Sequence, residues 1–162
     1  PCQSSAASDV YKRQIQTLKK KLLKNVLLIT PNIPEAEILA ETSIKNKEDM
    51  IFAANKLIDL GAKNVLLKGG HLKSKKVIDL YLSKSDFKVF TSFRHRTKNT
   101  HGTGCTLSSA IATFLSCGKS IKSACALGIK YVNSAILTNP NYGKGHGPIN
   151  HVNSMKIKKK FN

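Results

Sequence analysis

Hydrophobic residues recur along this chain either at the spacing of an amphipathic helix or in short continuous runs. Positions repeating every three or four residues predict helices, and short apolar runs predict buried strands. The predicted helices lie around residues 15–23, at 34–41 with Pro34 in the first turn, at 47–60, from the glycine-rich turn at 101–104 to a cap at Gly118, and from Ile121 to Asn139-Pro140. The apolar positions of the first are Ile15, Leu18, Leu22 and Leu23. The predicted strands are residues 26–29, 65–67, 76–82 and 87–93, and the last two are close enough to form a hairpin.

This order of elements predicts an α/β layered domain. A doubly wound sheet opens with several strand–helix units, whereas a single buried strand precedes the hairpin here. We therefore expect the chain to be the C-terminal half of a larger fold. Residues 1–14 are polar and aperiodic, and we interpret them as a leader foreign to the fold, such as a cloning scar. The folded part is expected at residues 15–151, with a basic, solvated tail at residues 152–162.

Basic residues greatly outnumber acidic ones, with 27 Lys and Arg against 9 Asp and Glu, for a net charge of +18. Such a charge first suggests a non-catalytic nucleic-acid binder. However, only Arg13, Arg94 and Arg96 are arginines, and base-reading surfaces favour arginine. No acidic residue follows Asp86, so the second half carries a positive field that suits any polyanion, including a nucleoside triphosphate. We expect no nucleic-acid partner and keep this class as the alternative.

Length and composition limit the location of the protein. The 162 residues, 41% of them hydrophobic, suit one globular domain. The apolar runs are much shorter than the roughly 20 residues that cross a bilayer, so we expect no membrane partner. The four cysteines form no C-x-x-C pair, which favours a reducing cytoplasm over a disulfide framework.

The most informative stretch is the sequence T-H-G-T-G-C-T at residues 100–106, which opens a long helix with an apolar stripe. Glycines let backbone N–H groups approach an anion, and the helix N-terminus adds a partial positive charge. Transfer of a phosphoryl group needs this kind of stabilisation. Cys105 falls in the first helical turn, where the pKa of a thiol tends to fall, so it is a candidate base or nucleophile. The alternative is an ordinary glycine turn with a buried cysteine.

Two further candidates follow predicted buried strands. Asn32 and Glu35 offer an amide oxygen and a carboxylate that can hold Mg²⁺, usually through waters. The alternative is a simple helix start, with Glu35 favourable in the first turn. Lys68 precedes Gly69 at the end of the second buried strand, where a lysine can reach a phosphate. The alternative there is a plain turn with an exposed lysine.

Two other motifs lack residues that the sites they resemble require. Gly118-Lys119-Ser120 resembles the end of a Walker A loop, but residue 113 is Thr and the motif follows a helix rather than a strand. His101 and Cys105 have a metal-ligand spacing, but no second pair of ligands is nearby to complete a zinc site.

Taken together, these segments resemble one family closely. The stretches T-P-N-I-P-E-A-E at 30–37, V-L-L-K-G-G-H at 65–71, N-T-H-G-T-G-C-T-L-S at 99–108 and G-H-G-P-I-N-H at 145–151 look like hydroxymethylpyrimidine/phosphomethylpyrimidine kinases of thiamine biosynthesis. The resemblance covers about residues 15–151. It implies a ribokinase-like, three-layer α/β/α fold and the use of MgATP to phosphorylate hydroxymethylpyrimidine and then its monophosphate.

The resemblance also implies roles for single residues. Gly102, Thr103 and Gly104 would form the anion hole, and Cys105 would take the place of the aspartate base of other ribokinase-like kinases. The cofactor-binding set would be Lys68, Thr100, Gly102 and Gly104 for ATP. Asn32 and Glu35 would organise Mg²⁺. The loop ending at His151 matches the family without an assigned role.

The chain departs from the family pattern at its N-terminal side. The glycine-rich pyrimidine-binding segment and about 100 residues of the ~250–270 typical of such α/β kinases are not seen, so we expect the fragment to be inactive alone. A pyridoxal-type kinase of the same superfamily is the alternative enzyme. We expect the full-length form to be a homodimer.

Overall fold

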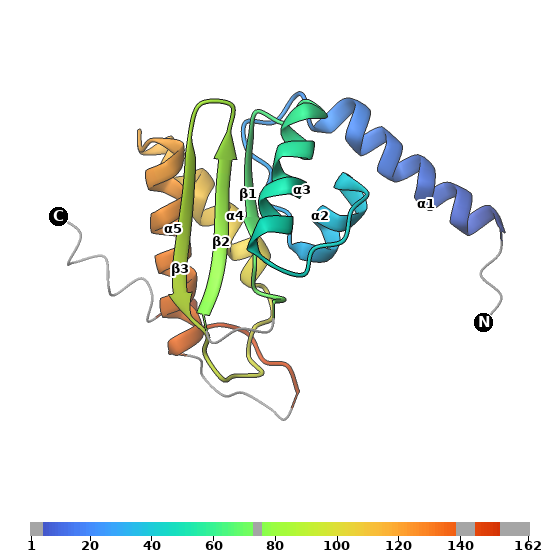
Figure 1. The fold of residues 1–162 in the computed structure, drawn as a ribbon. Coiled ribbons are helices and arrows are strands. Elements are labelled where there is room, and N and C mark those ends of the chain that lie inside the picture. Colours follow the sequence, from blue (N-terminus) through green and yellow to red (C-terminus); the bar gives the residue numbers. More distant parts are fainter. Residues whose placement is uncertain (1–4, 73–75, 139–144, 153–162) are drawn as a thin grey trace. The chain divides into compact units, whose positions relative to one another are not determined.

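A computed structural model describes residues 5–72, 76–138 and 145–152. The chain divides into two compact units, residues 1–91 and residues 92–162. The first unit holds most of the strands, and the second holds a pair of long helices (Figure 1). Each unit is described by itself below.

The first unit opens with a helix that begins earlier than the apolar spacing predicts. Helix α1 spans Ser5–Thr17 and continues into a π-helical turn, η1, at Leu18–Leu22. The described residues from Ser5 onward are therefore helical, which the aperiodic pattern of residues 1–14 did not predict. Of the predicted apolar face, Leu23 is fully buried, whereas Leu18 and Leu22 are exposed. The buried residue of η1 is Lys19, whose Nζ contacts a carboxylate oxygen of Glu41.

The sheet of this unit has three strands, β1 at Asn64–Lys68, β2 at Lys76–Ser83 and β3 at Phe87–Phe93, in the order β1-β2-β3. Strands β1 and β2 are antiparallel, with Asn64 opposite Ser83 and Lys68 opposite Asp79. The second predicted buried strand and both hairpin strands are therefore confirmed.

The first predicted buried strand, residues 26–29, is wrong. This segment forms no ladder, and its one bridge to β1 among the described residues is the isolated parallel pair Ile29 and Val65. A second isolated bridge, Asn32 to Lys68, lies just beyond the segment. The middle of the segment is open to solvent, since Leu27 is 51% exposed. Burial of a strand depends on what covers its faces and edges, which the apolar run itself does not encode.

Helices α2, Ile33–Ala40, and α3, Lys47–Asp59, confirm the two predictions made for this part of the chain. Helix α3 contacts both β1 and β2 (Figure 1). Its apolar face and the inward residues of the strands form the core. The fully buried members of that core are Ala36, Met50, Ala53, Ala54, Leu57, Val65, Leu67 and Leu80.

The second unit is built on helices α4, Thr103–Ser116, and α5, Ile121–Leu137, which pack against each other. Gly118 adopts a positive φ of 77° and ends α4, as predicted. The two helices approach closely at Gly128, where an added Cβ would lie only 2.8 Å from Cγ1 of Ile111. The predicted end of α5 at Asn139-Pro140 and the tail beyond residue 152 lie outside the described residues.

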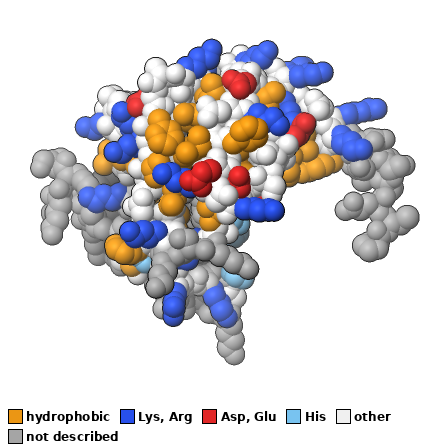
Figure 2. All heavy atoms as spheres, in the orientation of Figure 1, with side chains coloured by type: hydrophobic (Ala, Val, Ile, Leu, Met, Phe, Trp, Pro, Cys, Tyr) orange, Lys and Arg blue, Asp and Glu red, His pale blue; other side chains and the backbone are white. Residues whose placement is uncertain are grey.

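Charged side chains are dispersed over the face shown in Figure 2. Lys and Arg side chains lie there among hydrophobic and acidic ones. Within the same described residues, no helix combines the length and apolar character needed to cross a membrane.

Candidate functional site

The glycine-rich turn opens α4 in a geometry that exposes backbone donors. Gly102 is the residue before the helix and has a left-handed backbone, with φ 85° and ψ 0°. Its carbonyl accepts from the N–H of Thr106 at 2.9 Å, and Thr103 N–H donates to Thr100 at 3.3 Å. The amides of Gly104 and Cys105 donate no hydrogen bond within the described part of the chain. These two N–H groups, together with the helix dipole, form a candidate anion site.

Cys105 lies in the first turn of α4, and its side chain is exposed. The alternative expectation of a buried cysteine is therefore wrong at this position. A thiol here can meet a reacting group beside the two amides, which a buried thiol could not do. Thr100 and Gly102 are also exposed, so the turn is accessible from solvent.

In the first unit, Asn32 and Glu35 form a reciprocal capping box at the start of α2. The Asn32 Oδ1 accepts from the N–H of Glu35 at 2.9 Å, and Glu35 Oε2 accepts from the N–H of Asn32 at 2.7 Å. The helix-start alternative is thus correct as a description of the local structure. One oxygen, Glu35 Oε1, remains outside the capping box, so the pair retains a carboxylate oxygen that a hydrated cation could use.

The structure brings Lys68 next to this capping box. Asn32 and Lys68 face each other in a parallel bridge, and the N–H of Lys68 donates to the carbonyl of Pro31 at 2.9 Å. The predicted metal pair and the predicted phosphate-binding lysine therefore share one corner of the first unit. The predicted residues of the glycine-rich turn belong to the second unit.

Asp79 is a buried carboxylate at this corner that the sequence analysis missed. It is 8% exposed, lies opposite Lys68 in the β1–β2 register, and accepts from the N–H of Gly69 at 3.0 Å. Burial raises its pKa from 3.8 to about 6, against the lowering effects of the Gly69 hydrogen bond and the Lys68 charge. Its sequence signal was a single acidic residue inside an otherwise apolar strand.

Gly69 itself is required by this packing. A Cβ at this position would lie 1.9 Å from the carbonyl oxygen of Ile78, which no rearrangement of a side chain can relieve. A Cβ added at Gly70 would meet nothing within 4 Å, so only the first glycine of the pair is required by steric packing. The backbone of β1 therefore turns away immediately after Lys68, beside the buried Asp79 carboxylate.

A second missed residue is Asn99, just before the glycine-rich turn. Its side chain is buried, and its Oδ1 accepts from the N–H of Gly147 at 2.9 Å. Asparagine at the start of a loop gives no sequence signal for a partner 48 positions away.

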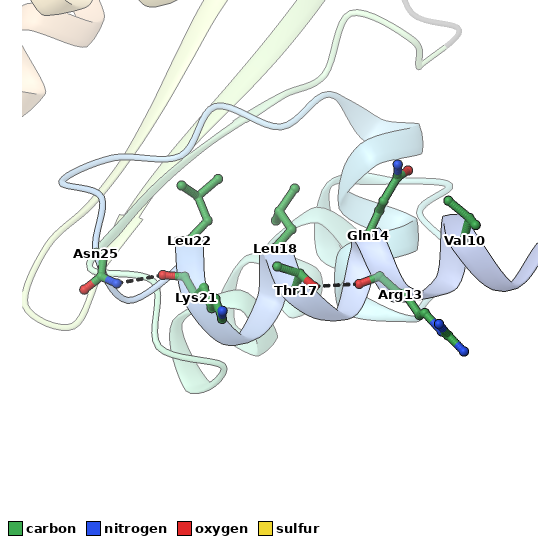
Figure 3. Close-up of a pocket in the computed structure, with 8 residues that line it drawn as sticks. All are labelled: Val10, Arg13, Gln14, Thr17, Leu18, Lys21, Leu22 and Asn25. Atoms are coloured by element: carbon green, nitrogen blue, oxygen red, sulfur yellow. Dashed lines mark hydrogen bonds between the residues drawn. The ribbon is translucent and has the colours of Figure 1, made fainter.

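A hollow of about 720 Å³ lies elsewhere, along α1 and η1 (Figure 3). Its lining residues all come from this helical segment and the turn after it: Val10, Arg13, Gln14, Thr17, Leu18, Lys21, Leu22 and Asn25. Because one helical segment and its turn supply the whole lining, the hollow is an open surface without convergent polar groups. It contains none of the predicted site residues, and we do not assign it a function.

The described residues contain no group of three or more His, Cys, Asp or Glu side chains arranged to hold a metal. A cation at Glu35 would therefore have fewer than three such ligands within the described residues, and waters or ligand oxygens would fill its other positions.

Sequence comparisons identify relatives over nearly the whole chain. The sequence model of the phosphomethylpyrimidine kinase family matches residues 2–150, which include most of the predicted leader. The thiamine biosynthesis bifunctional protein ThiED of Geobacter sulfurreducens is 46% identical over 90% of this chain and 30% of its own length. The hydroxymethylpyrimidine/phosphomethylpyrimidine kinase of Bacillus subtilis is 38% identical over 90% of this chain and 54% of its own length. The chain thus spans about half or less of these relatives.

Solved structures agree with the sequence relatives. A Bacillus subtilis pyridoxal kinase in complex with ADP has a TM-score of 0.85 at 32% identity, over 90% of this chain and 57% of that one. A phosphomethylpyrimidine kinase from Clostridium difficile has a TM-score of 0.63 at 40% identity, over 75% of this chain and 48% of that one. The similarity to such kinases confirms the predicted ribokinase-like α/β fold. The family match over residues 2–150 shows that this chain belongs to the phosphomethylpyrimidine kinase family.

Proposed function

We propose that this chain carries the phosphoryl-transfer part of an ATP-dependent kinase that acts on hydroxymethylpyrimidine and on its monophosphate. The observation that carries the proposal is the start of α4, where the Gly104 and Cys105 amides have no hydrogen-bond acceptor among the described residues and Cys105 is exposed. The names of the relatives supply the substrate class. Complexes of related kinases with AMP-PCP and ADP support a nucleotide as the donor.

The proposed chemistry follows from these donors. Charge builds on the oxygens of a phosphoryl group during transfer, and fixed N–H groups at a helix N-terminus stabilise it without reorganising. Gly102 allows the left-handed turn that leaves the amides free. As the thiolate, the exposed Cys105 would accept the proton of an attacking alcohol and become the thiol.

The two proposed acceptors make different demands on this site. The hydroxymethyl group must lose a proton as it attacks, so it benefits from a base. The monophosphate attacks with an oxygen that is largely ionised at neutral pH, because its second pKa is about 6. Cys105 therefore matters more in the first step, whereas the backbone amides serve both.

Lys68 and Glu35 fit auxiliary roles in the first unit. The Lys68 ammonium is a charge suited to ATP phosphates, and the bridge to Asn32 fixes its backbone. Magnesium binds through one or two carboxylates while keeping several waters, and the oxygen of Glu35 left outside the capping box fits that donor set. When bound, Mg²⁺ would neutralise phosphate charge.

The test is a coupled assay of ATP consumption with the natural protein that carries this chain. Hydroxymethylpyrimidine, its monophosphate and pyridoxal are compared as acceptors. The proposal predicts turnover with the first two, with kcat/KM for hydroxymethylpyrimidine at least tenfold above that for pyridoxal. Turnover of pyridoxal alone, or of none of the three, would contradict it. Sedimentation equilibrium of the same protein checks the expected homodimer.

A pyridoxal kinase is the second candidate, on one specific observation. Several related structures with TM-scores of 0.82–0.85 are pyridoxal kinases, some solved with pyridoxal bound. Their identity to this chain is 32–33%, below the 46% and 38% of the thiamine-biosynthesis relatives. The acceptor assay above decides between the two candidates.

A further inference from the structure

The segment at residues 145–150, which we call the strap, matched the family without a role, and the structure shows what it contacts. Three hydrogen bonds join it to the residues just before α4. The Nδ1 of His146 lies 3.1 Å from the carbonyl of Lys98, Gly147 N–H donates to Oδ1 of Asn99 at 2.9 Å, and His101 N–H donates to the Gly147 carbonyl at 3.3 Å.

The other end of the strap is tied to the end of α5. The backbone N–H of Asn150 donates to the carbonyl of Ala135 at 2.9 Å, and its side-chain Nδ2 donates to the carbonyl of Thr138 at 2.7 Å. Asn150 thus supplies donors to carbonyls that the end of a helix leaves unpaired. Ile149, between the two anchors, is 3% exposed.

The central contact is the one that solvent cannot replace. Asn99 is 7% exposed, Gly147 is buried, and the bond between them is buried as well. Loss of the Asn99 oxygen would leave the Gly147 N–H without a partner in a dry site. The contact to His146 is exposed, so water offsets part of its loss and its contribution is smaller.

We propose that the strap is a positioning element, in which Asn99 fixes the residues before α4 and thereby aims the Gly104 and Cys105 amides at a phosphoryl group. Gly147 bonds to this stretch at two points, the Asn99 side-chain oxygen and the His101 N–H, and the Thr100 carbonyl in turn accepts from the N–H of Thr103, the first residue of the helix. Asn99 acts through the turn and does not touch the reacting atoms. The inference rests on the proposed function for the identity of the anion.

The first arm of the test measures amide hydrogen exchange by NMR on the full chain without nucleotide. Asn99→Ala is expected to lower the protection of Gly147 and also that of Thr106, whose N–H is bonded to the Gly102 carbonyl, each by about tenfold. Loss of protection at Gly147 with Thr106 unchanged would overturn the proposal, because the strap would then not hold the turn.

The second arm measures ATP kinetics in the natural protein. An anion site that acts in the transition state predicts a fall in kcat of about 10–100-fold for Asn99→Ala, with KM for ATP within about threefold. Tyr81→Phe is the matched control, because it removes another buried hydrogen bond, from Tyr81 to Asn64, in the other unit. A kcat loss in Asn99→Ala no larger than that of this control would overturn the proposal.

A second variant and the separate readouts keep the test decisive if Asn99→Ala does not fold or if the protein shows no turnover. If Asn99→Ala does not fold, His146→Ala removes only the exposed contact to Lys98 and is expected to lower Thr106 protection and kcat in the same direction, by about two- to fivefold. No change in either quantity would overturn the proposal. Absence of turnover in the unmodified protein would contradict the proposed function, whereas the exchange arm would still decide whether the strap holds the turn.

Discussion

Replacing Asp79 by Asn tests the electrostatics of the corner at Lys68. The carboxylate is buried, and its pKa in the folded chain is raised from 3.8 to about 6, chiefly by burial. Folding therefore disfavours the ionised form. The stabilising contribution of the protonated carboxyl is complete below pH 3.8 and is lost as the pH rises through about 6. At 1.36 kcal/mol for each pKa unit, the loss at neutral pH is about 3 kcal/mol.

Asp79→Asn removes this pH dependence while leaving an oxygen that can accept from Gly69. The free energy of unfolding of the variant minus that of the unmodified chain should therefore rise by about 2–3 kcal/mol between pH 4 and pH 7. Urea titrations of both chains at several pH values measure this difference, in which the contributions of other groups cancel.

Asp59→Asn, at an exposed position, is the matched control. Its free energy of unfolding relative to the unmodified chain should change by less than about 1 kcal/mol over the same pH range. If the free-energy difference between Asp79→Asn and the unmodified chain did not change with pH, the reasoning would be refuted. The ionised carboxylate would then be as stable in the folded chain as in the unfolded one.

The remaining predictions concern the same corner. Gly69→Ala should lower the free energy of unfolding by about 3 kcal/mol in urea titrations, because the added Cβ meets the Ile78 carbonyl. Gly70→Ala is the control and should change this free energy by less than about 0.5 kcal/mol. Similar losses for the two variants would contradict the steric argument. Asn32→Ala should cost about 1 kcal/mol in the same measurement through loss of the capping box, and no loss would speak against that cap. Lys68→Ala should raise KM for ATP about tenfold in steady-state assays with kcat nearly unchanged, and an unaltered KM would remove Lys68 from the site.

Local sequence was sufficient for the elements whose structure is decided locally. Pro34 and the Asn32–Glu35 pair predicted the start of α2, and Gly118 predicted the end of α4. The glycine-rich turn could likewise be predicted, because a left-handed residue such as Gly102 before a helix is a local property. These signals need no knowledge of the rest of the fold.

The features that were missed depend on residues distant in sequence. Asp79 is buried because the β1–β2 register places it opposite Lys68. Asn99 matters through Gly147, 48 positions later. Residues 26–29 are apolar enough for a buried strand, but pairing with β1 decides whether they form one, and the structure gives them a single isolated bridge, Ile29 to Val65. No pattern of spacing within one segment contains this information.

Cys105 provides the most direct test of the proposed chemistry. In the natural protein, Cys105→Ala removes the proposed base at the start of α4 and leaves the Gly104 and Cys105 backbone amides in place. Loss of a general base costs about 10²–10⁴-fold. Cys117→Ala, an exposed cysteine at the other end of the same helix, is the matched control and should leave both steps unchanged. Cys105→Asp supplies a carboxylate and should retain more activity than Cys105→Ala.

The decisive measurement is kcat/KM of Cys105→Ala with hydroxymethylpyrimidine and, separately, with its monophosphate. We predict a loss of about 10²–10⁴-fold with the alcohol and a loss at least tenfold smaller with the monophosphate, whose attacking oxygen is already ionised. Equal losses with the two acceptors would contradict a base at Cys105 and reduce the thiol to a structural part of the helix start.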